Sequence, residues 1–268
     1  MLLFLACVPS PIEQSLVVNE LEIVFSAVPA GSFVMGDDEE QADSIPKHEV
    51  TISSSFWMMQ TEVSQQLYEE ILSQNPSQNQ HPLHPVEQVS WLDGIAFANA
   101  LSKRMGLEEC YHITQAEFIE VTWPKGLNCT GYRLPTEAEW EWAALSANTD
   151  YRWRSNTKYS GSHYIFEVGW YRKNSDGGHH PVAQLAPNSL HLFDLTGNVS
   201  EWVWDTYSFY TNTPKQDPFS TDIGRNRISR GGGWSDNLDD QNLKRRFTDG
   251  YDWKFDWVGF RVVQSKPN

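Results

Sequence analysis

The sequence predicts a single globular domain of mixed helices and strands in which much of the backbone is irregular. The chain has 268 residues, enough to bury a sizeable core, and 12 Trp, 13 Phe and 10 Tyr supply an aromatic-rich interior. Its 17 Gly and 14 Pro interrupt regular structure often, which argues against a helical bundle. No linker, low-complexity segment or internal repeat divides residues 21–266, so we assign them to one domain.

The strand patterns come first along the chain. Leu21 to Phe25 and Ser32 to Met35 flank the turn residues Pro29-Ala-Gly31, which predicts a strand, a turn and a second strand. Val50 to Trp57 predicts one further continuous strand. Residues 8–20 contain two prolines and no strong periodicity, so together with the start of the chain they predict a signal end and tether over residues 1–20.

Three helices are expected to begin at capping residues. Ser64 caps the first, Ser90 with Asp93 opens the second, and Thr136 with Glu139 forms a capping box at the start of the third. Gly106 ends the second helix. The apolar residues expected on the three buried faces are Leu67, Tyr68, Ile71 and Leu72, then Trp91, Ile95, Ala98 and Leu101, then Trp140, Ala143 and Ala144.

Regular patterns become scarce after Asn148. Stretches 148–190 and 205–228 hold few clean periods and many turn residues. Loops this long in a compact domain are usually functional or need local fastening.

The charge of the chain excludes two classes of partner. Its formal net charge is -15, with an acidic cluster at residues 37–40. A chain this acidic is poorly suited to nucleic acid or to an anionic lipid surface. We therefore expect no nucleic-acid partner and contact with a membrane only through a lipid anchor.

The first of the three cysteines points to export. Cys7 follows Leu2-Leu-Phe-Leu-Ala6, which resembles the end of a bacterial lipoprotein signal. The apolar stretch is shorter than a normal signal core and no basic residue precedes it; a start site assigned too late would explain both. The alternative is a short apolar N-terminus with no export role. We expect lipidation at Cys7 and a place in the cell envelope, anchored in the outer membrane or exported to the periplasm.

The other two cysteines form an even pair. In an oxidising compartment Cys110 and Cys129 predict a disulfide closing a loop of about 20 residues, worth roughly 3 kcal/mol in the chain-entropy model. The alternative is two reduced, buried thiols in a cytosolic protein. We expect the disulfide.

Seven motifs occur in a fixed order over most of the chain. They are Gly31-Ser-Phe-Val-Met-Gly36, His48-Glu-Val with Thr61-Glu-Val-Ser64, His84-Pro-Val86 with Val89-Ser-Trp91, Gly131-Tyr-Arg-Leu-Pro-Thr-Glu-Ala-Glu-Trp-Glu-Trp-Ala-Ala144, Pro187-Asn188 with Leu192-Phe-Asp-Leu-Thr-Gly-Asn-Val-Ser-Glu-Trp202, Arg230-Gly-Gly-Gly-Trp234, and Gly259-Phe-Arg261. The series resembles the formylglycine-generating enzyme (sulfatase-modifying factor) family. The resemblance implies an α+β, loop-rich fold, related to C-type-lectin-like architectures, with little regular secondary structure.

The resemblance also implies a calcium site. Members of the family bind structural Ca²⁺ at the segment matching Asp194 to Glu201. Carried over, Asp194 and Glu201 would ligate through side chains, and Gly197 and Val199 through carbonyl oxygens, the hard ligands that Ca²⁺ takes. From spacing alone, a turn Asp and an exposed Glu explain the segment as well. A second family calcium site falls near residues 155–176, where no ligands align.

Oxidase chemistry is not expected. Active relatives carry two cysteines after R-G-G-S-W, whose thiolates hold Cu(I), an ion that needs soft sulfur ligands. The matching positions hold Asp236 and Gln241, the motif serine is Gly233, and no cysteine follows Cys129. We expect no copper and no formylglycine-generating activity.

The histidines are expected to be structural. His81 and His84 have the H-x-x-H spacing of a metal pair, but both lie beside prolines in an apparent loop. His179 and His180 lie in a Gly-rich turn and are expected at the surface.

These observations predict a non-catalytic lipoprotein that serves as a binding or assembly component of the cell envelope. Its partner would be a peptide, protein or glycan held by aromatic rings beside guanidinium groups. The alternative for these aromatics is a place in the core. The alternative function is a periplasmic oxidase or maturation factor of the same superfamily that uses other residues. The expected groove residues are Trp234, Asp236, Arg245, Arg246, Tyr251, Trp253 and Trp257.

Overall fold

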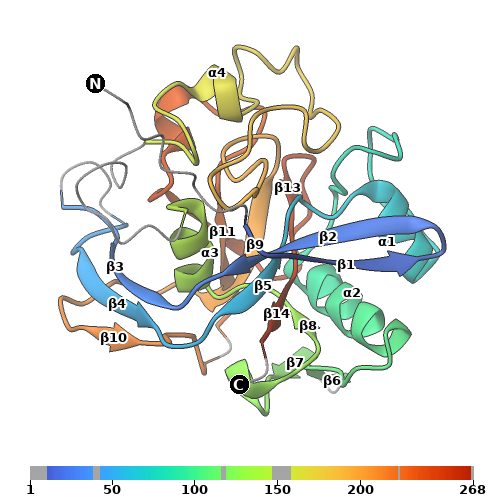
Figure 1. Cartoon of the computed structure of the whole chain (residues 1–268), viewed down its shortest axis with the longest axis horizontal. Helices are drawn as coiled ribbons and strands as arrows, with labels where there is room; N and C mark the ends of the chain where they lie inside the picture. The colour runs from blue at the N-terminus through green and yellow to red at the C-terminus, as the bar shows by residue number, and fades with distance from the viewer. Residues whose placement is uncertain (1–10, 39–42, 116–118, 147–157, 223, 267–268) are drawn as a thin grey trace, which may run out of the picture.

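Short strands in four sheets and four α-helices make up the computed structural model, which describes residues 11–38, 43–115, 119–146, 158–222 and 224–266 (Figure 1). Long irregular connections join these elements. The expectation of an α+β, loop-rich fold with little regular secondary structure is confirmed.

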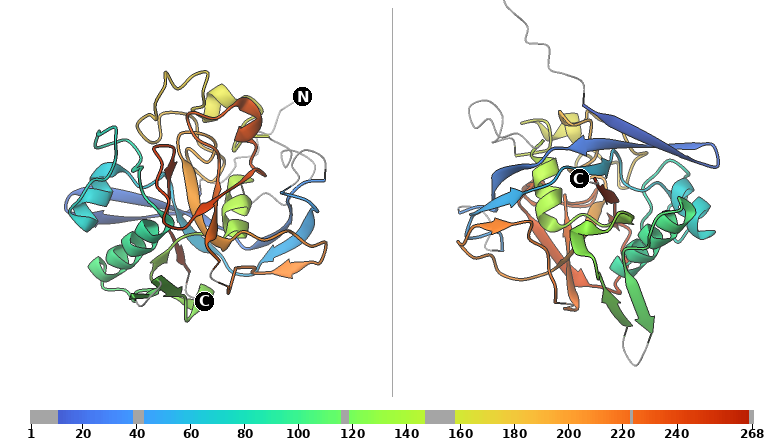
Figure 2. Two further views of the ribbon diagram at one scale, coloured as in Figure 1. Left: turned by 180° about the vertical axis from the view of Figure 1, so that it is seen from behind. Right: turned by 60° about the horizontal axis from the view of Figure 1, so that its bottom comes forward.

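The largest sheet has five strands and gathers both ends of the chain. In spatial order its strands are β1 (Glu13–Val18), β2 (Leu21–Val28), β5 (Phe56–Met59), β14 (Val263–Ser265) and β8 (Tyr132–Arg133). All the pairings are antiparallel. The hairpin of β1 and β2 runs along the outside of the domain toward α1 (Figures 1 and 2).

Three smaller sheets complete the fold. The three-stranded sheet contains β10 (Lys215–Gln216), β4 (His48–Ile52) and β3 (Gly31–Met35); the four-stranded sheet contains β12 (Arg246–Gly250), β11 (Asn226–Arg230), β9 (Ser200–Thr206) and β13 (Val258–Gly259); the two-stranded sheet contains β6 (His112–Gln115) and β7 (Ile119–Thr122). The predicted calcium segment, Asp194 to Glu201, ends in the first two residues of β9. β11 leads into the segment that holds Asp236.

The helices begin where the capping signals place them. They are α1 (Gln65–Leu72), α2 (Trp91–Arg104), α3 (Glu137–Ala144) and the short α4 (Ile165–Val168). Ser64 caps α1, and Ser90 and Thr136 each form a reciprocal capping box with the residue three positions on. α1 and α2 pack through stacked rings of Tyr68 and Phe97, with centroids 5.5 Å apart.

α3 is buried on every side because its acidic residues have buried arginine partners. Glu139 pairs with Arg133 at 2.6 Å, and Glu137 pairs with both Arg230 and Arg246. Burying a charge is tolerated only with such pairing and hydrogen bonding. The helix therefore ties β8, β11 and β12 together. Its apolar side chains belong to the core around the three-stranded sheet, and a second core surrounds α1 and α2.

Two strand expectations were wrong. Val50 to Trp57 is not one strand: the chain breaks at Ser53–Ser55 and passes from β4 in one sheet to β5 in another. Asp217 fixes this break by accepting hydrogen bonds from the N–H and hydroxyl of Ser53. Residues 13–18, expected in a tether, form β1, paired along its whole length with β2.

Candidate functional site

The two residues at the positions of the copper-binding cysteines both hydrogen-bond the backbone of Gly233. Asp236 Oδ2 accepts the N–H of Gly233 at 2.8 Å, and Gln241 Nε2 donates to the carbonyl oxygen of Gly233 at 2.9 Å. Gln241 is fully buried, and a Cβ on Gly232 would lie 2.9 Å from its Oε1. The side chains thus brace the turn after β11; we call them, with Gly233, the Gly233 brace.

The local backbone explains this arrangement. Gly231 and Gly232 have φ of +96° and +71°, so the chain turns sharply after Arg230. A 3₁₀ turn over Leu238–Gln241 then returns Gln241 to the glycines. Burial raises the pKa of Asp236, and nearby Asp240 raises it further. Hard oxygen atoms and a neutral amide, already hydrogen-bonded, do not suit Cu(I).

In the segment predicted to bind calcium, the two acidic side chains already have partners. Glu201 is fully buried, and its two oxygens accept from Arg261 Nη2 at 2.7 Å and Arg261 Nε at 2.8 Å. Glu201 Oε2 also accepts the indole N–H of Trp140. Asp194 Oδ2 accepts the N–H of Ala183 at 2.7 Å.

The rest of that segment is held by protein contacts as well. Gly197 lies so close to Trp170 that a Cβ on Gly197 would be 2.2 Å from the carbonyl oxygen of Trp170. Val199 donates its N–H to Glu62. The residues as placed do not fit a calcium ion, because Arg261 supplies the positive charge that Glu201 needs. Among the described residues, no group of three or more His, Cys, Asp or Glu side chains is placed to hold a metal ion.

We therefore expect millimolar calcium to leave the Tm unchanged through this segment. The measurement is thermal unfolding in calcium and in a chelator, with Asp194→Asn as the matched variant, since an amide oxygen can still accept from Ala183. A calcium-dependent rise in Tm that disappears in Asp194→Asn would contradict this expectation and restore the predicted site. An equal rise in both proteins would place calcium elsewhere.

Sequence reasoning missed the buried carboxyl group of Glu62 beside this segment. Its oxygens accept from Val199 N at 3.0 Å and from Asn198 Nδ2 at 2.7 Å. Burial raises the pKa of Glu62 strongly, and Asp194 and Glu201 add to the effect. The only local signal was its place in the Thr61-Glu-Val-Ser64 motif.

The expected disulfide is present, and Cys7 lies outside the described residues. Cys110 and Cys129 are joined by an S–S bond of 2.02 Å, and both are buried. The bond fastens the segment that follows β7 to the end of the loop after α2.

The residues expected to line one groove make separate contacts in different parts of the domain. Arg246 is buried in its ion pair with Glu137, and its guanidinium lies 4.1 Å from the ring centroid of Tyr210. Arg245 pairs with Asp43 and Asp240. The remaining residues have separate contacts: Trp234 donates to Asp256, Tyr251 packs on the α1–α2 core, and Trp253 and Trp257 are exposed beside Phe255. Of the seven, only Arg246 lines either of the two cavities described next.

The expectation that His179 lies at the surface was wrong. It is buried, and its Nδ1 lies 2.8 Å from Nδ1 of His84, so one imidazole donates to the other. Burial, with the neighbouring histidines His179, His81 and His180, lowers the pKa of His84 to about 4. Behind the pair, His179 Nε2 lies 3.7 Å from buried Glu87. The histidines join two loops far apart in the sequence.

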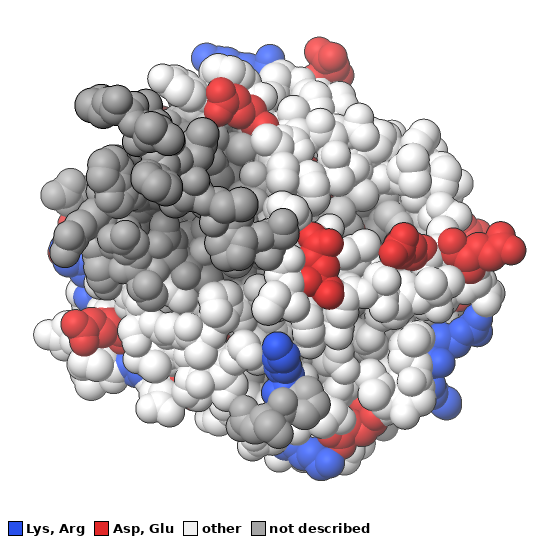
Figure 3. Space-filling model, in the orientation of Figure 1, with Lys and Arg blue, Asp and Glu red and all other residues white. Residues whose placement is uncertain are grey.

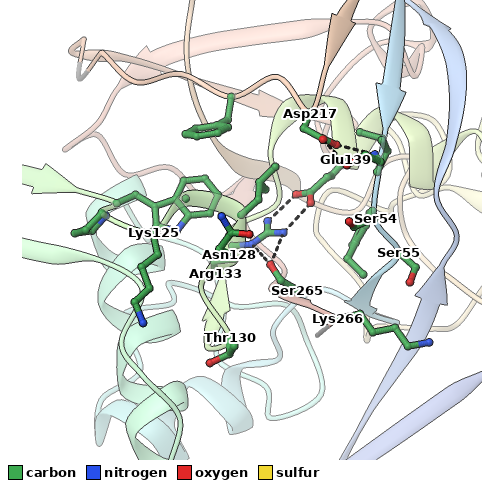
Figure 4. Close-up of a pocket in the computed structure, with 18 of the residues that line it drawn as sticks. Ser54, Ser55, Lys125, Asn128, Thr130, Arg133, Glu139, Asp217, Ser265 and Lys266 are labelled. Atoms are coloured by element: carbon green, nitrogen blue, oxygen red, sulfur yellow. Dashed lines mark hydrogen bonds and ion pairs between the residues drawn. The ribbon is translucent and has the colours of Figure 1, made fainter. Parts of the chain in front are cut away.

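The larger of the two cavities lies elsewhere, beside the disulfide-bonded loop. It has a volume of about 720 Å³, within the range of small-ligand sites, and its walls come from stretches around Ser54, Lys125, Phe219 and Ser265. The ion pair of Arg133 and Glu139 lies at its base (Figure 4). We call it the Trp123 pocket, after the indole in its wall.

The second cavity has a volume of about 340 Å³, and its lining includes the carboxyl group of Asp205 in β9, next to the start of α3. Asp205 accepts the N–H of Glu137 and of Ser220, each at 2.7 Å. Burial, and then repulsion from Glu137, raise the pKa of Asp205 to about 6 despite these hydrogen bonds.

This shift predicts a pH-dependent stability. A carboxyl group with a raised pKa in the folded state contributes stability that is complete below about pH 4 and is lost as pH rises to about 6, on the order of 3 kcal/mol at most. We expect Asp205→Asn to lack this component when urea unfolding is measured from pH 4 to pH 7.

The quantity to compare is the slope with pH. Asparagine turns an NH₂ toward a backbone N–H, so the variant will be less stable at every pH. Asp239→Asn, at a side chain 90% exposed, is the control and should keep the wild-type slope. A wild-type slope in Asp205→Asn would show that Asp205 titrates normally.

Comparison with known proteins places this geometry in a family context. The profile described as "Sulfatase-modifying factor enzyme 1-like domain" matches residues 22–266. The "Chaperone protein LppX" of Paenibacillus barcinonensis is 32% identical over 246 residues, covering 80% of this chain and 81% of that protein. The mouse "Formylglycine-generating enzyme" is 26% identical over 244 residues, covering 77% of this chain and 65% of the enzyme.

The solved structures agree in fold. "Treponema denticola variable protein 1" superposes with a TM-score of 0.83 at 29% identity, covering 96% of this chain and all of that one. None of the helices in the described part of the chain has the length and apolarity needed to cross a membrane.

Proposed function

The chain belongs to the sulfatase-modifying factor enzyme 1-like family, and we propose that it is a non-catalytic member that binds another protein in the cell envelope as a chaperone or assembly component. Lipidation at Cys7 is part of the proposal and rests on the Leu5-Ala-Cys7 sequence alone. The class of partner, the bound calcium and the cellular location of the protein must be tested in the same way.

The Gly233 brace carries the non-catalytic part of the proposal. Where active relatives need two thiolates, this chain has Asp236 and Gln241, which both hydrogen-bond the backbone of Gly233. The positions serve to hold a turn. Cys110 and Cys129 form a disulfide with each other, so neither offers a thiolate.

The relative named as a chaperone supports the protein-binding part. That protein and this chain match over about four fifths of the length of each. A domain that binds without chemistry also fits a scaffold in which Glu137 and Glu139 of α3 are paired with arginines of β8, β11 and β12.

The oxidase arm of the test uses a cysteine-containing sulfatase-motif peptide with Cu(I) and oxygen. We expect the peptide mass to stay unchanged. Asp236→Cys/Gln241→Cys is the companion variant: it restores two soft ligands and should bind Cu(I) where the wild-type chain does not. Conversion of the peptide by the wild-type chain would overturn the proposal. A stoichiometric redox metal with oxygen consumption would favour the alternative, an oxidase using other residues.

The binding arm measures light scattering from chemically denatured citrate synthase diluted into buffer. We expect the full chain at a few-fold molar excess to suppress aggregation, and serum albumin at equal mass to do so much less. Scattering equal to the albumin control would remove the chaperone assignment while leaving the absence of oxidase activity standing.

A further inference from the structure

The two carboxylates that line the Trp123 pocket are already paired. Both oxygens of Glu139 accept from Arg133, at 2.6 and 2.7 Å. Both oxygens of Asp217 accept from Ser53. A ligand that offers hydrogen-bond donors or a positive charge would therefore find no free carboxylate among these two.

The cationic side chains of the pocket remain available to a ligand. The indole Nε1 of Trp123 also lacks a hydrogen-bond partner among the described residues, but it is buried and out of reach of a ligand oxygen. Figure 4 shows Lys125 and Lys266 on opposite sides of the pocket, with Arg133 and Ser265 between them.

The two lysines can turn toward a ligand. The side chain of Lys125 is 63% exposed and pairs with Glu108, a surface ion pair worth little. The ammonium of Lys266 lies 5.0 Å from the ring centroid of Trp57. In a chain of net charge -15, whose charged side chains are scattered over the face shown in Figure 3, two lysines at one cavity make a local site for an anion.

The remaining lining suits a sugar ring. Trp123 and Phe219 meet edge to face, with centroids 5.1 Å apart, and Gly126 lets Phe219 approach: a Cβ there would lie 3.0 Å from the ring. Aromatic faces pack against the C–H faces of a pyranose. Hydroxyl and amide groups in the lining come from Ser54, Ser55, Asn128, Thr130, Thr221 and Ser265.

We propose that the Trp123 pocket binds a carboxylate-bearing sugar, a hexuronate or its oligomer. A sugar ring packs on the aromatic side chains of Trp123 and Phe219, and carboxylates of the oligomer pair with Lys125 and Lys266 on the two sides of the pocket. This site is separate from the Gly233 brace, and the inference goes beyond the proposed function without depending on it.

The test is calorimetric titration of the full chain with oligogalacturonate, using its methyl-esterified form of equal length as the uncharged control. We expect binding of the acid, roughly tenfold or more weaker binding of the ester, and weakening with added salt. Lys125→Gln/Lys266→Gln should lower affinity for the acid at least about tenfold, since each charge-assisted hydrogen bond is worth about 1.5–3 kcal/mol. Lys173→Gln, at an exposed lysine outside the pocket, should bind as the wild type does.

Two further measurements separate a sugar site from a charged surface. Trp123→Phe keeps a ring but reduces the aromatic surface beside Phe219, and we expect weaker binding with an unchanged disulfide and cooperative unfolding. Polyglutamate of similar charge should bind much more weakly than oligogalacturonate. Equal binding of acid and ester, equal binding of polyglutamate, or full affinity in the double lysine variant would each overturn the proposal.

Discussion

Replacing Arg261 with Met should lower the free energy of unfolding by about 3–5 kcal/mol, the usual effect of removing one partner from a buried ion pair. Arg261 is fully buried and holds both oxygens of Glu201. It also donates to the carbonyl oxygens of Met59, Gln60 and Phe193. Methionine fills much of the volume but leaves a buried carboxylate and three carbonyls without these donors.

The loss should depend on pH in a definite direction. Arg261 lowers the pKa of the nearby carboxyl groups of Glu62 and Asp194, so removing it raises both values further. Groups with raised folded-state pKa contribute stability at low pH that is lost as pH rises. Urea unfolding should therefore show a larger difference between Arg261→Met and wild type at pH 7 than at pH 5.

Two controls isolate the charge. Arg225→Met removes an exposed arginine, 74% accessible, that pairs with Asp252 at 3.8 Å, and should cost less than about 1 kcal/mol. Glu201→Gln added to Arg261→Met removes the stranded charge and should recover part of the loss. A loss below about 1 kcal/mol in Arg261→Met would mean that Glu201 is satisfied by something other than this arginine, as a bound cation would do.

The helices were predictable because their signals are local. Ser64, Ser90 and Thr136 lie next to the backbone N–H groups that they accept from, so a window of four residues contains the whole interaction. Strand pairing has no such window. Nothing within Val50 to Trp57 shows that Asp217, far along the chain, fixes the break at Ser53.

The site residues follow the same division. The resemblance to the family identified the positions of Asp236 and Gln241, and their residue types predicted that they do not suit Cu(I). Their shared partner, the backbone N–H and carbonyl oxygen of Gly233, depends on the path of the loop between them. Likewise, Glu201 was expected to ligate calcium, whereas its side chain pairs with Arg261, 60 positions away in the sequence. The walls of the Trp123 pocket come from four stretches that are far apart in the sequence, and no local pattern predicted that they meet.

Removing the Cys110–Cys129 bond should lower the free energy of unfolding by about 3 kcal/mol, from the entropy of a loop closed over a sequence separation of 19 residues. Cys110→Ser/Cys129→Ser is the variant, because both sulfurs are buried and a single substitution would leave an unpaired thiol. Urea unfolding of the wild type, with and without a reductant, and of the variant is the measurement. Reductant should bring the wild type close to the variant and leave the variant unchanged.

The same variant should act on the Trp123 pocket before it acts on the rest of the fold. Cys129 directly follows the 3₁₀ turn Gly126–Asn128, which forms a wall of the pocket with Trp123 and Lys125. Amide hydrogen exchange should therefore speed up in residues 119–130 while α3, held by three buried arginines, keeps its protection. If exchange rose equally in α3, the disulfide would be stabilising the whole domain, and the wall of the pocket would have no separate dependence on it.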